Sequence, residues 1–102
     1  MEEAKLLYDS GKAIFIDARN KAEYQEAHIK GAINIQVDTT PEQIKNLENI
    51  LKDKILVTYC NGIGCYLSDK VAYKLFDMGY RNIVIFFSGW NKWNEHNLPI
   101  EK

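Results

Sequence analysis

The chain of 102 residues lacks several features that mark particular classes of protein. No apolar run is long enough to cross a bilayer as a helix, so we expect no membrane partner. Proline occurs only twice, and 46% of the residues are apolar, which is typical of an ordered globule rather than a disordered segment. The length predicts a single domain, residues 1–102, with one modest core.

Charge of either sign is not in excess. The 13 Lys and Arg residues and the 14 Asp and Glu residues are scattered singly along the chain. Without a basic stripe that would bind phosphates, we expect no nucleic-acid partner. The acidic start, Met1-Glu2-Glu3, does not resemble a secretory signal. We therefore expect a cytoplasmic protein, or a periplasmic one if a signal segment has been removed.

Cysteine and histidine are also scarce. Cys60 and Cys65 lie in one short segment and are too few for a disulfide scaffold. A zinc site would need further ligands, and the only histidines, His28 and His96, have no recognised ligand spacing. A thioredoxin-type pair has two residues between its cysteines, whereas this pair has four. We therefore expect no metal and no cofactor.

The pattern of the chain is organised around residues 55–79. Residues 55–59 are apolar and predict a strand, and residues 66–78 have the apolar spacing of a helix. Between them, Cys60 opens a glycine-containing loop whose N–H groups, together with the helix N-terminus, would favour an anion. A thiolate or perthiolate is such an anion, so Cys60 is predicted to be a nucleophile. The predicted anion-binding backbone amides are those of Asn61, Gly62, Ile63, Gly64, Cys65 and Tyr66.

The rest of the chain also alternates between strand and helix patterns. Strands are predicted at residues 13–17, 32–35 and 81–87, and helices at 3–10, 20–27, 40–51 and after Trp90. The core-facing residues of two of these helices are predicted to be Leu6 and Leu7, and Ile44, Leu47, Ile50 and Leu51. This alternation predicts an α/β fold with a mainly parallel, four- to five-stranded sheet and helices on both faces. Ligands of such sheets bind beyond the carboxyl ends of the strands, where Cys60 lies.

Several short motifs follow one another along the chain. They are Ile16-Asp17-Ala18-Arg19, Glu23-Tyr24, the segment from His28 to Asn34, Tyr59-Cys60, residues 79–83, Ser88-Gly89-Trp90, Trp93 and Leu98-Pro99. In their order and spacing they resemble the single-domain rhodanese-like sulfurtransferases over nearly the whole chain. The resemblance implies that the loop cysteine takes a sulfane sulfur from a donor, holds it as a persulfide and passes it to a nucleophilic acceptor. The donor would be thiosulfate, a polysulfide or a persulfide-carrying protein, and the acceptor a thiol.

Two departures from the family pattern bear on this expectation. Many relatives have an arginine five residues after the cysteine, where this chain has Cys65. Losing a charge-assisted contact of ~1.5–3 kcal/mol should weaken the binding of thiosulfate roughly ten- to a hundredfold. The loop instead resembles a variant that reads Cys-Asn-Gly-x-x-Cys, then an aromatic residue and a serine, here Tyr66 and Ser68. Secondly, almost nothing precedes Glu3, so the family's usual first strand is in question.

Two roles for Cys65 remain open at the level of sequence. As a resolving thiol, it would attack the persulfide on Cys60, release hydrosulfide and leave an internal disulfide. As a structural residue, it would pack as a small apolar side chain beneath the loop.

Four other residues are candidates for support of the site. Asp17 and Arg19 are expected to form an ion pair near the loop, with Arg19 adding positive potential at its mouth. Trp90 follows the last strand and is expected to line the pocket. His28 is expected to fix a turn by bonding backbone groups rather than to act as a base.

The function predicted from these residues is sulfur transfer through a Cys60 persulfide. The alternative is a non-catalytic rhodanese-like module that binds a partner or senses oxidation. A cysteine-dependent phosphatase is rejected because it needs an arginine six residues after its nucleophile, where this chain has Tyr66.

Overall fold

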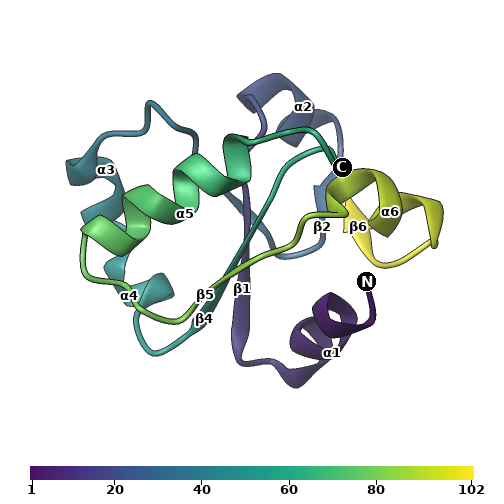
Figure 1. The fold of residues 1–102 in the computed structure, drawn as a ribbon, viewed down its shortest axis with the longest axis horizontal. Helices are drawn as coiled ribbons and strands as arrows, with labels where there is room; N and C mark the ends of the chain where they lie inside the picture. The colour runs from purple at the N-terminus through teal and green to yellow at the C-terminus, as the bar shows by residue number, and fades with distance from the viewer.

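The centre of the fold is a sheet of four parallel strands in the order β3-β1-β4-β5 (Figure 1). The computed structural model describes residues 1–102. The strands are β1 (Ala13–Asp17), β3 (Ile33–Asn34), β4 (Ile55–Tyr59) and β5 (Ile83–Ile85). The inner strands β1 and β4 are covered on both faces, which explains why their sequences are almost continuously apolar. Their register pairs Asp17 with Tyr59, so both residues lie at the carboxyl edge of the sheet.

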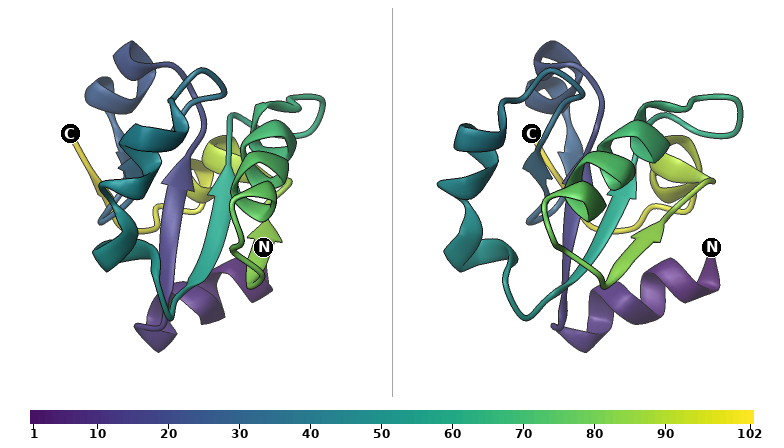
Figure 2. Two further views of the ribbon diagram at one scale, coloured as in Figure 1. Left: turned by 90° about the vertical axis from the view of Figure 1, so that its left-hand side faces the viewer. Right: turned by 60° about the vertical axis from the view of Figure 1, so that its left-hand side comes forward.

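Helices cover both faces of this sheet (Figure 2). One layer contains α1 (Glu2–Ser10) and α6 (Gly89–Glu95), and the other contains α3 (Pro41–Lys45), α4 (Glu48–Leu51) and α5 (Leu67–Asp77). The remaining helix, α2 (Lys21–Glu26), follows β1 at the carboxyl edge. A separate antiparallel pair joins β2 (His28–Ile29) to β6 (Ile100–Glu101). The predicted α/β architecture is therefore confirmed. None of the helices has the length and apolar character needed to cross a bilayer.

The sheet divides the predicted single core into two clusters. Alternate residues of a strand point to opposite faces, so Ile16 and Leu56 pack beneath α3, α4 and α5, whereas Phe15 and Val57 pack against α1 and α6. Trp93 of α6 is fully buried in the second cluster. Both clusters hold the carboxyl ends of β1 and β4 in place.

Some details differ from the sequence-based expectations. Leu6 is 71% exposed because α1 packs through Ala4 and Leu7. The predicted helix at 40–51 is two short helices, α3 and α4, and Ile50 is exposed because Ile44 and Leu51 form the inward face. The last strand is shorter than predicted, and no strand precedes α1 among the described residues.

Candidate functional site

Cys60 lies directly after β4 and is 2% exposed. The N-terminus of α6 fixes the start of its loop, because the Trp90 amide donates to the Cys60 carbonyl at 2.8 Å and the Asn91 amide donates to the Asn61 carbonyl at 2.9 Å. Gly89 has a φ of +62°, and a Cβ added there would overlap with the Cys60 carbonyl oxygen. Only glycine allows this approach of α6 to the loop.

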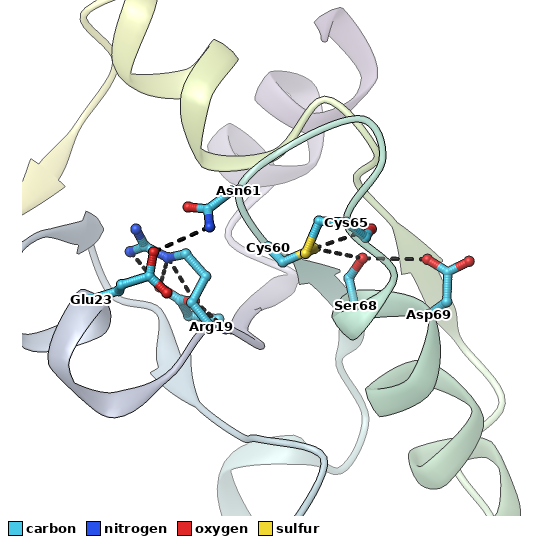
Figure 3. The surroundings of a disulfide bond; sticks show 8 residues. Arg19, Glu23, Cys60, Asn61, Cys65, Ser68 and Asp69 are labelled. Atoms are coloured by element: carbon cyan, nitrogen blue, oxygen red, sulfur yellow. Dashed lines mark hydrogen bonds and ion pairs between the residues drawn. A yellow bond between two sulfur atoms is a disulfide. The ribbon is translucent and has the colours of Figure 1, made fainter.

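The loop is closed by a disulfide between Cys60 and Cys65, whose Cα atoms are 6.4 Å apart (Figure 3). Of the six amides predicted to bind an anion, the Cys65 amide donates to the Gly62 carbonyl at 3.0 Å. The other five donate to no protein group; they belong to Asn61, Gly62, Ile63, Gly64 and Tyr66. The loop itself is open to solvent, with Ile63 89% exposed.

Two polar atoms lie near the Cys60 sulfur. The Cys65 carbonyl oxygen is 3.3 Å from Sγ, and the hydroxyl oxygen of Ser68 is 3.6 Å from it. Ser68 is in the first turn of α5, is 2% exposed and lies 3.5 Å from a carboxylate oxygen of Asp69 (Figure 3). The sequence identified Ser68 only as part of a loop pattern. The sequence signal that could have identified Ser68 as a neighbour of Cys60 is its place in the first turn of the helix that follows the loop.

A buried hydrogen-bonded network lies on the other side of Cys60. Arg19 donates to the carboxylate of Asp17 from Nη2 at 2.8 Å and from Nε at 3.1 Å, and to the Ala27 carbonyl at 2.6 Å. The Tyr59 hydroxyl donates to Asp17 at 2.9 Å and accepts from the Ile29 amide at 3.1 Å. Asp17 and Tyr59 are fully buried, and Arg19 is 3% exposed.

The network sets the charges of its members. Burial acts to lower the pKa of Arg19, but hydrogen bonding and charge interaction with Asp17 outweigh burial and raise this pKa above its usual value. Burial, together with the negative charge of Asp17, raises the pKa of Tyr59 well above its usual value. At neutral pH the guanidinium is therefore charged and the phenol is neutral.

A cleft of about 210 Å³ lies beside this network and the base of the loop. It is lined by Arg19, Glu23, Glu26, Ala27, Asn61, Trp90 and Asn91. The Arg19 guanidinium lies over the ring of Trp90, 4.7 Å from its centre. The side-chain Nδ2 of Asn61 donates to a carboxylate oxygen of Glu23 at 3.1 Å and ties the loop to α2. This contact joins distant segments, and no motif of the sequence predicts it. The lining has one cation, already paired with Asp17, and two carboxylates.

His28 takes no part in this arrangement. Its Nδ1 lies 2.7 Å from the Tyr24 carbonyl, and its ring stacks on that of Tyr24 with the centres 3.8 Å apart. Its Nε2 lies 3.4 Å from a carboxylate oxygen of Glu101. His28 thus bonds a backbone group, but that of Tyr24 before β2 and not one in the predicted turn from His28 to Gly31.

Comparison with known protein families gives one match that covers most of the chain. The family described as Rhodanese-like domain matches residues 1–96. A protein of Sodalis glossinidius named tRNA uridine(34) hydroxylase is 37% identical, over 80% of this chain and 24% of its own length. Its namesake in Erwinia tasmaniensis is 34% identical, over 96% of this chain and 29% of its own length. This chain therefore spans less than a third of these curated relatives.

Solved structures show the same fold. The BH2092 protein of Bacillus halodurans superposes with a TM-score of 0.84 and 27% identity, over 98% of this chain and 72% of that one. A rhodanese-related protein of Thermoplasma volcanium superposes with a TM-score of 0.69 and 24% identity, over 96% of this chain and 92% of that one. With its family match over residues 1–96, the chain belongs to the rhodanese-like domain family.

Proposed function

We propose that this domain is a sulfurtransferase that carries sulfane sulfur as a persulfide on Cys60. The observation that supports the proposal best is the loop after Cys60, in which five backbone amides donate to no protein group. Such amides are partial positive charges that can stabilise an anion. The N-terminus of α5 follows the loop and adds the positive end of its dipole. A sulfur anion at Cys60 can therefore be stabilised although the loop has no cationic side chain.

The reaction begins with the reduced loop. The Cys60 thiolate attacks the sulfane sulfur of the donor, and a new S–S bond forms as the donor's own bond to that sulfur breaks. With thiosulfate as donor, sulfite leaves with the electron pair, and Cys60 becomes a perthiolate. A thiolate acceptor then attacks the outer sulfur, and Cys60 leaves as a thiolate. The cycle consumes no oxidant.

The charge around the loop favours some donors over others. A small dianion such as thiosulfate finds no cation in the loop, and the adjacent cleft contains Glu23 and Glu26. We therefore propose that a polysulfide or a protein persulfide is a better donor than thiosulfate.

Cys65 is proposed as a resolving thiol in the absence of an external acceptor. Its thiolate attacks the Cys60 sulfur of the protonated persulfide, the bond to the outer sulfur breaks, and hydrosulfide leaves. The product is the Cys60–Cys65 disulfide, the pairing present in the structure. A thiol reductant must then open this disulfide before the next cycle. If Cys65→Ser releases hydrosulfide at an unchanged rate without added thiol, Cys65 has no such role.

Intact-mass measurement tests the main proposal. The reduced protein is incubated separately with thiosulfate, with polysulfide and with a persulfide-generating desulfurase. We expect the mass to rise by one sulfur atom, the gain to be lost on cyanide treatment, and Cys60→Ser to show no gain. Absence of a gain with all three donors would reject sulfur transfer.

The disulfide also favours a second candidate function, a redox-sensing module without turnover. In this case an external oxidant, such as a disulfide or a peroxide, would take two electrons from the dithiol to form the disulfide, and a thiol reductant would reverse the change. The domain would alter its contacts with a partner accordingly. The same mass experiment separates the two functions. A sensor would lose two hydrogen atoms on oxidation but would gain no sulfur from any donor.

We propose sulfur-carrying small molecules or proteins, and not nucleic acid, as the partners of this domain. The word tRNA in the names of two relatives describes proteins of which this chain spans less than a third. The 13 basic and 14 acidic residues of the chain provide no excess of positive charge for a phosphate backbone.

A further inference from the structure

We propose that the hydroxyl of Ser68 stabilises the sulfur anion of Cys60 and so takes the place of a loop cation. The inference rests on the proposed sulfurtransferase function and names a further residue that contacts the reacting sulfur. Ser68 is the only side chain that brings a polar oxygen or nitrogen within hydrogen-bond distance of the Cys60 sulfur, with Oγ 3.6 Å from Sγ.

The second polar neighbour of the sulfur acts in the opposite direction. The Cys65 carbonyl oxygen, 3.3 Å from Sγ, can accept a hydrogen bond from a neutral thiol but cannot donate one to a thiolate. This contact favours the protonated form of Cys60. The ionised sulfur therefore gains from a donor in addition to the loop amides, and a hydroxyl that rotates about its C–O bond can supply one.

Burial makes this donor more important. Cys60 and Ser68 are each 2% exposed, so water has little access to the sulfur from their side. The Ser68 hydroxyl can also donate to Asp69, 3.5 Å away. Asp69 is only partly buried, so solvent can reach its carboxylate. The ionised sulfur of Cys60 is buried and has less access to water than the Asp69 carboxylate. It therefore gains more from a hydrogen bond donated by the Ser68 hydroxyl.

The charged groups around the loop do not replace Ser68. The Arg19 guanidinium is paired with Asp17. The Glu23 carboxylate accepts a hydrogen bond from the side-chain amide of Asn61. Asp69 of α5 is negative, and α6 contributes backbone amides to the base of the loop. None of these side chains contributes an unpaired positive charge at the sulfur.

A hydrogen bond to an ionised acceptor predicts a measurable effect. Replacement of Ser68 by alanine should raise the pKa of the Cys60 thiol by roughly one unit. At a pH well below the thiol pKa, a one-unit rise lowers the thiolate fraction about tenfold, so persulfide formation measured there should slow by up to about tenfold.

The experiment titrates Cys60 in a Cys65→Ala background, where it is the only thiol. Its pKa is obtained from the pH dependence of iodoacetamide alkylation, and persulfide formation is measured with polysulfide by intact mass. Ser68→Ala is compared with Ser68→Thr, which keeps the hydroxyl, and with Thr58→Val. Thr58 is a matched control because its hydroxyl is also buried but has no hydrogen-bond partner.

We expect Ser68→Ala to raise the pKa and slow the reaction, Ser68→Thr to restore both largely, and Thr58→Val to change neither. Thermal melting confirms that each variant is folded. A folded Ser68→Ala protein with the parent's pKa and rate would overturn the role of Ser68 while leaving sulfur transfer intact. A parent with an ordinary thiol pKa and no sulfur gain would overturn both proposals.

Discussion

The polar groups on the two sides of Cys60 differ in whether they have hydrogen-bond partners within the protein. Before it, Tyr59 joins Asp17 and Arg19 in a buried network in which the carboxylate, guanidinium and phenol all have protein partners. After it, the loop leaves five backbone amides without a protein partner and exposes Ile63. Cys60 therefore lies between a buried network, whose charged groups are paired, and a loop that is open to a ligand.

The difference follows from access to water. An unpaired polar group that is buried loses its hydration, whereas an amide in an exposed loop keeps it. The network must therefore be complete for the fold to be stable, and the loop need not be. We infer that the network fixes the end of β4 while the loop retains donors for a sulfur anion.

We expect the largest effect on stability when the cation, Arg19, is removed from the network. Arg19→Met keeps much of the apolar stem but leaves the Asp17 carboxylate buried without its ion-pair partner. We expect the free energy of unfolding in urea to fall by ~3–5 kcal/mol, because a buried charge is left uncompensated. Lys5→Met, which breaks the solvent-accessible Lys5–Asp9 pair, is the control and should cost less than about 1 kcal/mol. Equal losses for both variants would refute the structural importance of the network.

The contact between α6 and the loop gives the second test. In Gly89→Ala, the added methyl group would overlap with the Cys60 carbonyl and approach the Asn61 carbonyl carbon to 3.0 Å. Overpacking costs ~1–3 kcal/mol and a left-handed φ costs ~1–2 kcal/mol, so we expect a loss of about 3 kcal/mol. Gly64→Ala is the control, since φ is +94° there but nothing lies within 4 Å of the new Cβ. If both variants unfold at the same urea concentration, the contact with α6 does not matter.

Tyr59 gives a smaller effect and one that depends on pH. Tyr59→Phe leaves the buried Ile29 amide without its acceptor and removes one donor from Asp17. At neutral pH we expect the free energy of unfolding to fall by ~1–3 kcal/mol.

The alkaline limb of the stability curve should also differ between the two proteins. The pKa of Tyr59 is raised in the folded state, so its stabilising contribution is complete below its unfolded value of 10.0 and is lost as the pH rises above that value. Above pH ~10 the parent should lose about 1.4 kcal/mol per pH unit more than Tyr59→Phe. The other tyrosines with raised pKa values, Tyr8, Tyr24 and Tyr80, are present in both proteins and cancel. If the free energies of unfolding of the parent and Tyr59→Phe fell equally with pH above about 10, the raised pKa of Tyr59 would be contradicted.

Sequence reasoning predicted the fold because its signals are local. The continuous apolar runs of β1 and β4 reflect burial on both faces. At α3, Thr40 and Gln43 form a reciprocal capping box, which is another local signal of a helix start. Leu6 and Leu7 show what local signals cannot predict, namely which of two adjacent apolar residues is buried. Adjacent apolar residues on a helix cannot both face the core fully, and packing against the sheet selects Leu7.

The site was less accessible from sequence because its contacts join distant segments. The position of Cys60 at the carboxyl edge follows from its place directly after a strand of a parallel sheet. The tie between Asn61 and Glu23 spans 38 residues and depends on how α2 and the loop are placed relative to one another. Likewise, the contact of Ser68 with the Cys60 sulfur depends on the path of the loop, which spacing does not determine.

The smallest expected effect concerns the tie between the loop and α2. Asn61→Ala removes one partly buried hydrogen bond to Glu23, and solvent can reach the carboxylate that loses it. We expect the free energy of unfolding to fall by less than about 1 kcal/mol, because a bond to water replaces the bond to protein. Asn94→Ala on the exposed surface of α6 serves as a control for the substitution itself. A loss as large as that of Arg19→Met would place the loop within the rigid network, and the proposed division of the molecule at Cys60 would then be wrong.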